Sequence, residues 1–173
     1  MGLLFASGCL VSSLHPLYED DSIVFDDALL GEWENSESEI TVSVSRGEWR
    51  SYQIAFTDRF GTTRFNGHLT TIGAARFLNI LPHEGLEKAS FIVATNGFMQ
   101  IQIESARVRV REPDYDGVVQ RLKARKLGVE AAMDLKQNVI VTAPSPKLRA
   151  WVAAALKDEA LWADWKTFTR SAR

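Results

Sequence analysis

Short stretches in which apolar and polar residues alternate run through the middle of the chain. Ile40, Val42 and Val44 alternate with threonine and serine, and a period of two is typical of a strand with one buried face. The same pattern predicts strands over 39–45, 52–57, 62–72, 75–81, 91–95, 98–104 and 106–112. Glycine-containing segments between several of these stretches are typical of tight hairpin turns. The sequence therefore predicts a meander of antiparallel strands.

The pattern changes in the last third of the chain. Apolar residues recur at helical spacing over 114–126, which predicts an amphipathic helix. Residues 138–143 have the pattern of one more strand. The Ser-Pro pair at 145–146 is typical of a helix start, and we expect helical structure over 146–165.

A run of short antiparallel strands leaves unpaired edges unless the sheet closes. We therefore expect a mainly β fold, an up-and-down antiparallel β-barrel of 8–9 strands with helices towards the C-terminus. A length of 173 residues suits one domain, which we place at 31–173. The interior of an eight-stranded barrel is either filled by side chains or holds one small ligand.

Acidic residues are concentrated in the first part of the chain. Residues 1–45 hold nine Asp and Glu and no Lys or Arg, and the rest holds 20 basic and 13 acidic residues, a balance of +7. This asymmetry either docks the N-terminal segment onto the body or belongs to a solvated acidic leader, and we favour the solvated leader. Dense Lys/Arg runs that bind phosphates are absent, which argues against a nucleic-acid partner.

Cys9 is the only cysteine of the chain, and the small residues Ala6, Ser7 and Gly8 precede it. This stretch resembles the lipobox of bacterial lipoproteins, in which the peptide is cut just before a cysteine that carries a diacylglyceryl group. The resemblance implies lipidation of Cys9. It also implies that residues 1–8, which hold no Lys or Arg, are part of a signal peptide. The alternative is a cytoplasmic chain with a small buried cysteine.

A second resemblance lies between the cysteine and the first strand. The letters GEW at 31–33 resemble the G-x-W signature of lipocalins, in which the tryptophan plugs the closed end of the barrel. With LHPLY at 14–18 and IVFD at 23–26, the segment is similar to the start of lipocalin-like bacterial lipoproteins of uncharacterised function. The resemblance implies that residues 9–30 form a tether or leader and that Trp33 closes the base.

Arginines 107, 109 and 111 alternate with valine. We expect them on the solvated face of an edge strand, and contact with lipid phosphates is the alternative. His68 shares a strand face with Arg64 and Asn66. That face either points inward, where it would orient a polar ligand group, or outward into solvent, and we favour the outward orientation.

The chemistry needed for catalysis or metal binding is not evident in the sequence. His15, His68 and His83 form no pair at ligand spacing, and Cys9 has no second cysteine beside it, so we expect no metal and no cofactor. The sequence contains neither a G-x-S-x-G elbow nor a phosphate-binding glycine loop. We therefore expect a protein that is not an enzyme.

The sequence leads to a lipid-anchored, noncatalytic protein of the bacterial cell envelope, facing the periplasm or on the outer membrane. We expect it to bind a small apolar or amphipathic ligand in a barrel cavity of several hundred Å³. The alternatives are a ligand-free structural or partner-docking lipoprotein and a hydrolase. We expect the ligand-contacting side chains to be Trp33, Ile40, Val42, Val44, Ile54, Phe56, Met99, Ile101, Ile103, Val108 and Val110, with His68 as a polar candidate.

Overall fold

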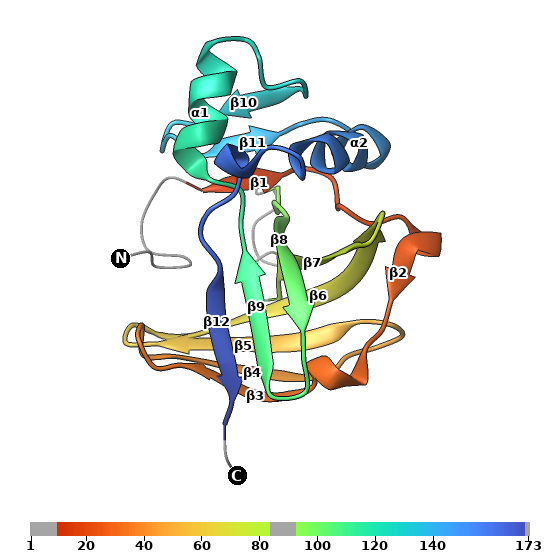
Figure 1. Ribbon diagram of the computed structural model, residues 1–173, viewed down its shortest axis with the longest axis vertical. Coiled ribbons are helices and arrows are strands. Elements are labelled where there is room, and N and C mark those ends of the chain that lie inside the picture. Colours follow the sequence, from red (N-terminus) through yellow and green to blue (C-terminus); the bar gives the residue numbers. More distant parts are fainter. Residues whose placement is uncertain (1–9, 84–92, 172–173) are drawn as a thin grey trace.

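The computed structural model describes residues 10–83 and 93–171. Within these ranges, eight antiparallel strands close a barrel, because β6 pairs with both β5 and β7 and β12 lies between β9 and β3 (Figure 1). The strands are β3 (Gly31–Asn35), β4 (Ile40–Arg46), β5 (Tyr52–Asp58), β6 (Gly61–Ile72), β7 (Ala75–Pro82), β8 (Gly97–Ile103), β9 (Arg107–Arg111) and β12 (Lys166–Arg170). The expected mainly β, lipocalin-like up-and-down barrel is confirmed.

Most strands lie where alternation predicted them, but the segment 91–95 does not form one in its described part. Residues 93–95 are irregular, and residues 91 and 92 lie outside the described ranges. Asn96 instead forms a two-way backbone bridge with Ser13, with N–O distances of 2.8 and 2.9 Å. The chain there satisfies its backbone groups against the N-terminal segment and not within the barrel sheet.

The C-terminal strand of the barrel was missed. Helical structure was expected over 146–165. Helix α2 (Ser145–Ala155) instead ends ten residues earlier and is followed by a 3-10 turn (Glu159–Leu161) and then by β12. The predicted strand 138–143 exists as β11 (Val139–Val141), but it belongs to a different sheet. Phe168 is the only buried side chain of β12, so its apolar pattern is too short to detect.

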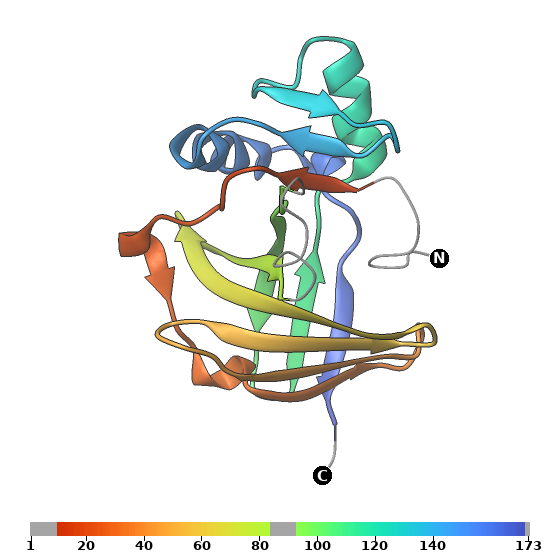
Figure 2. The same cartoon turned by 180° about the vertical axis from the view of Figure 1, so that it is seen from behind.

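A second layer lies on top of the barrel (Figures 1 and 2). Its sheet has the order β1 (Val11–Ser13), β11, β10 (Ala131–Met133), with β1 parallel and β10 antiparallel to β11. Helix α1 (Tyr115–Lys123) is capped by the preceding Asp114, whose Oδ1 accepts a hydrogen bond from the Gly117 amide at 2.7 Å. We call β1 together with residues 112–165 the cap.

The cap creates a second hydrophobic core outside the barrel. Phe77 of β7 and Phe98 of β8 pack in it with Val118 of α1 and Trp162, while the neighbouring Leu78 packs in the barrel core. Strand β7 is therefore buried on both faces. Because residues 77–80 face a core on each side, all four are buried and depart from simple alternation.

Residues 9–30 were expected as a tether or leader, and residues 10–30, the part that the structure describes, pack against the barrel and the cap. β1 completes the cap sheet, and β2 (Ile23–Val24) pairs with the second half of β6. Leu17 is fully buried, and its amide donates to Asn79 Oδ1 at 2.9 Å. Cys9 lies outside the described residues.

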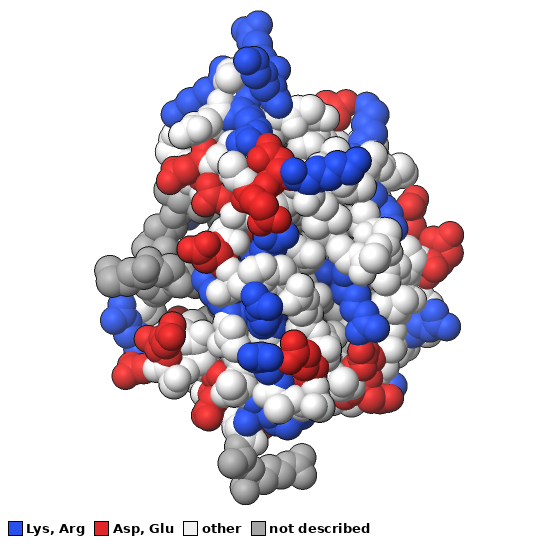
Figure 3. Space-filling view, viewed as in Figure 1, with Lys and Arg blue, Asp and Glu red and all other residues white. Residues whose placement is uncertain are grey.

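Ion pairs join this segment to the body at Glu19, Asp26 and Asp27, whereas Asp20 and Asp21 are exposed, so the expected solvated acidic leader is only partly solvated. Acidic and basic side chains are interspersed over the barrel (Figure 3), and several of the leader's carboxylates meet arginines of the body. Asp26 pairs with Arg76 and Asp27 with Arg46. The Asp27 pair is exposed on both sides and contributes little.

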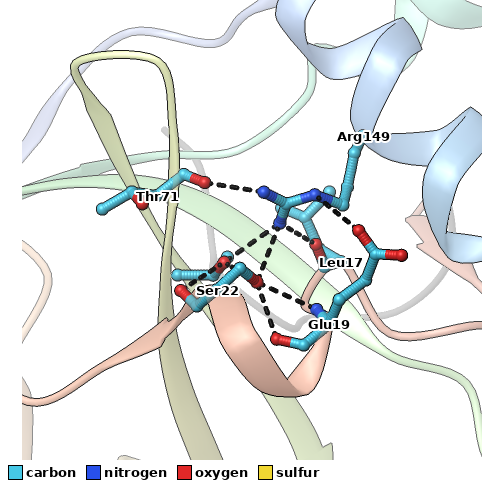
Figure 4. A network of polar contacts seen from close by, with 6 residues as sticks. Leu17, Glu19, Ser22, Thr71 and Arg149 are labelled. Carbon is cyan, nitrogen blue, oxygen red and sulfur yellow. Dashed lines mark hydrogen bonds and ion pairs between the residues drawn. The ribbon is translucent and has the colours of Figure 1, made fainter.

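Arg149 of α2 attaches the leader through hydrogen bonds (Figure 4). Its Nη1 donates to the carbonyl of Leu17 at 2.9 Å and to the hydroxyls of Ser22 and Thr70 at 3.2 and 3.0 Å. Its Nη2 donates to the carbonyl of Thr71 at 2.8 Å. The side chain is 18% exposed, so these bonds are formed largely away from water. One guanidinium thus joins cap, leader and barrel.

Replacing Arg149 with alanine leaves two carbonyls and two hydroxyls without this donor. We expect the free energy of unfolding to fall by about 2–4 kcal/mol, measured by urea unfolding. Lys147→Ala is the matched control on the same helix, because it removes only the exposed Lys147–Glu130 ion pair. We expect it to cost less than about 1 kcal/mol. Equal losses in the two variants would contradict the role given to Arg149.

Candidate functional site

The barrel interior is the candidate site, and its wall is entirely apolar. It surrounds a cavity of about 80 Å³. The lining side chains are Leu29, Trp33, Val42, Val44, Ile54, Phe56, Phe65, Leu78, Ile80, Met99, Ile101, Val108, Val110 and Phe168. Since none of them is ionisable, the interior can hold apolar groups but supplies no acid, base or nucleophile.

The sequence located much of this wall. The structure brings together Trp33, Ile54, Phe56, Met99, Ile101, Val108 and Val110 around the cavity, as well as Val42 and Val44. Ile40 and Ile103 belong to the same hydrophobic core but do not line the cavity.

Five lining residues were not predicted: Leu29, Phe65, Leu78, Ile80 and Phe168. The alternation of Phe65 and Leu69 with polar residues was the available signal for β6. Leu78 and Ile80 lie in a strand buried on both faces, where alternation says nothing about direction.

His68 lies on the outer face of β6, in the orientation favoured from sequence. Phe65 and Leu69 of this strand pack in the barrel core, so His68 points away from the cavity. Its ring centroid lies 4.6 Å from that of Tyr18. Burial lowers the pKa of His68 below its usual value and raises the pKa of Tyr18, which favours the neutral form of both rings.

The Trp33 side chain is buried and lines the barrel cavity. Its Nε1 donates to the carbonyl of Leu29 at 2.9 Å, and the guanidinium of Arg170 lies 4.2 Å from the centre of its ring. Arg170 also donates to the carbonyls of Ala28 and Leu30, both at 2.8 Å. This cation–π contact and its hydrogen bonds fasten the last strand of the barrel to the first.

Two observations favour glycine at position 31 beside this contact. Its φ of +129° lies in the region that side chains rarely adopt. A Cβ at this position would also lie 2.5 Å from Nη1 of Arg170. Glycine at position 31 therefore leaves room for the guanidinium of Arg170, which lies over the ring of Trp33 two residues further along the chain.

We expected the row of three arginines on an edge strand. This is wrong, because β9 pairs with both β8 and β12. Arg111 is only 8% exposed. It donates to Gln100 at 2.7 Å, forms an ion pair with Glu159, and lies over the rings of Trp162 and Trp165 at 5.4 and 4.8 Å. Arg111 thus anchors the cap to the outside of the barrel.

Two hollows lie outside the barrel interior. One of about 760 Å³ opens between α1 and α2, with Leu127, Trp151 and Leu161 among its lining residues. Two ion pairs, Lys147–Glu130 and Arg121–Asp158, are part of its rim. Nothing in the sequence had indicated this groove.

The other hollow, of about 330 Å³, lies on the outer face of β4, β5 and β6. His83, Arg64, Ser43 and Ser45 are among its lining residues, and the lining contains no carboxylate within the described part of the chain. A hydrolase of the Ser-His-Asp type needs a carboxylate to orient its histidine. A carboxylate that contacts this lining is that of Glu32, whose Oε1 accepts a hydrogen bond from the Ser43 hydroxyl at 2.6 Å.

Comparisons with protein-family models, with curated proteins and with solved structures give no match to this chain. Over residues 10–83 and 93–171, three or more His, Cys, Asp or Glu side chains nowhere gather as metal ligands. In the same ranges, no helix has the length and hydropathy needed to cross a membrane.

Gly31→Ala tests the close approach of Arg170 to position 31. We expect it to destabilise the protein by about 2–4 kcal/mol in urea unfolding, because it adds both backbone strain and a contact with Arg170. Gly61→Ala is the matched control, since Gly61 has a similar φ of +135° with nothing within 4 Å of an added Cβ. Its loss should be smaller by at least about 1 kcal/mol. If the two losses agree, the Arg170 contact does not constrain position 31.

Ile101→Ala tests how tightly the barrel interior is packed. Ile101 is 2% exposed, and its truncation should cost about 2–5 kcal/mol because neighbouring side chains cannot fill the space. Ile103, two residues further along the same strand, is only partly buried, and Ile103→Ala should cost less than half as much. Thermal and urea unfolding measure both. A negligible loss for Ile101→Ala would indicate an interior that is open and not packed.

Proposed function

We propose that this protein is a noncatalytic, lipid-anchored protein of the bacterial cell envelope whose barrel serves as a packed scaffold. The observation that carries the proposal is the barrel interior, which is wholly apolar and retains only about 80 Å³. Sites for small molecules usually measure ~300–1,000 Å³. This interior is therefore too small for the amphipathic ligand expected from the sequence, unless side chains move apart.

The lipid anchor is supported by the sequence Ala6-Ser7-Gly8-Cys9, which resembles a lipobox. A thioether-linked diacylglyceryl group and an additional acyl chain would together give stable anchoring. The anchor places the folded domain at a membrane of the envelope, facing the periplasm or at the outer membrane.

A small apolar ligand in the barrel is the second candidate. One observation favours it, namely that every residue around the remaining space is apolar. Met99 is one of these residues, and the flexible thioether side chain adapts its shape more readily than branched ones. A dry cavity of this kind accepts a small apolar molecule and excludes polar ones.

Native mass spectrometry of protein purified from its own membranes tests both candidates. We expect a mature chain that begins at Cys9 and carries the mass of a lipid, with no other bound molecule. An additional mass that is released on unfolding would favour the ligand-binding candidate. Cys9→Ser should abolish both the cleavage and the lipid and move the protein out of the membrane fraction. An unmodified cysteine in membrane-derived protein would rule out the anchor.

A further inference from the structure

The chain enters the folded cap immediately after Cys9. The amide of Leu10 donates to Asn138 Oδ1 at 3.1 Å, and its carbonyl accepts from the amide of Val139 at 2.8 Å. β1 begins at the next residue. Successive Cα atoms are ~3.8 Å apart, so a lipid on Cys9 would be attached one residue from the cap. A domain held this closely cannot move far from the bilayer.

The turn between β10 and β11 adjoins Leu10 and is held firmly by hydrogen bonds. Asp134 Oδ1 accepts from the amides of Lys136 and Asn138, both at 2.8 Å, and Asp134 Oδ2 accepts from Asn138 Nδ2 at 2.8 Å. The hydroxyl of Tyr115 donates to the Gln137 carbonyl at 2.7 Å. The hydrogen bond from the Asn138 side chain, with those from the backbone, lowers the pKa of Asp134. The carboxylate therefore stays charged while it holds the turn.

This turn presents Leu135 to solvent. Its side chain is fully exposed, and that of Leu10 is 36% exposed. A leucine held outward on an ordered turn gains nothing from packing within its own domain. Lys136 follows it, is exposed as well, and supplies a cation beside the apolar group.

The surroundings favour a bilayer as the surface that covers Leu135. In Figures 1 and 2 the turn lies on the same side of the molecule as the start of β1. Lys and Arg side chains gather at the upper margin of the cap, above a group of acidic side chains (Figure 3), and basic residues near an anionic bilayer are attracted to it.

We propose that Leu10 and the β10–β11 turn, with Leu135 and Lys136 at its tip, form the surface by which the cap lies on an anionic lipid bilayer. Leu135 enters the interfacial region, and Lys136 stays at the level of the phosphates. This inference rests on the proposed lipid at Cys9, because that lipid fixes which side of the domain faces the membrane.

The experiment uses the whole chain with one synthetic acyl chain coupled to Cys9 through a maleimide. Cys9 is the only thiol in the sequence, so the lipid is placed at one position whether or not the cell lipidates it. A single acyl chain gives only marginal membrane binding, and contacts made by the protein itself then become measurable. Binding is measured by co-sedimentation with phosphatidylcholine vesicles that contain a minority of phosphatidylglycerol, and with vesicles of phosphatidylcholine alone.

We expect Leu135→Ser/Lys136→Ser to reduce partitioning to the anionic vesicles by about tenfold or more. Lys136→Ser alone should reduce it on the anionic vesicles only. Trp49→Ser is the control, because Trp49 is 63% exposed in the β4–β5 loop on the opposite side of the molecule (Figure 1). It should bind like the parent, and unchanged thermal unfolding checks that all variants are folded.

Partitioning of the double variant that equals the parent's would overturn the contact surface and leave Leu135 to a partner other than lipid. An equal loss in Trp49→Ser would also overturn it, because binding would then depend on exposed apolar side chains in general. Neither result bears on the lipid anchor itself, which the mass of Cys9 from native membranes decides separately.

Discussion

The closure of the barrel by its last strand is the constraint on which the rest of the structure depends. β12 is separated in sequence from β9 by the cap and from β3 by almost the whole chain, yet it pairs with both. Without it, β3 and β9 would each expose a row of unpaired backbone groups. Arg170 secures this closure because its guanidinium covers Trp33 and binds the carbonyls that precede β3. The ends of the domain therefore stabilise each other.

The cap and the leader form a second unit of packing on the outer wall of that barrel. Phe77 and Phe98 point out of the barrel and into the cap core, so strands β7 and β8 contribute to both cores. Arg149 and Arg111 add polar attachments at two places, the first to the leader and the second to the barrel face beneath the cap. Because the leader is held from Leu10 onward by burial and hydrogen bonds, its described part does not act as a flexible spacer.

The interior of the barrel and the surface of the cap point to different roles. The interior carries no polar group at its wall and is almost filled, which suits a scaffold or a small apolar guest. Charged and exposed apolar side chains lie instead on the outside, at the rim of the groove between α1 and α2 and on the exposed turn near Leu10. For an anchored protein, the orientation of that outer surface relative to the membrane decides what it can contact.

The sequence by itself determined the barrel strands β4 to β9, the two helices and most of the barrel wall, since these depend on local alternation and on residues such as Ile101 and Val108 that point one way. Trp33 was expected as a wall residue from the resemblance of residues 31–33 to the G-x-W signature of lipocalins. Tertiary structure alone decided the position of β11 outside the barrel, the closing strand with its single buried Phe168, and the burial of Arg111 between tryptophans. These features depend on partners that are distant in sequence. A local pattern shows which side chains are apolar, but it does not show which distant surface covers them.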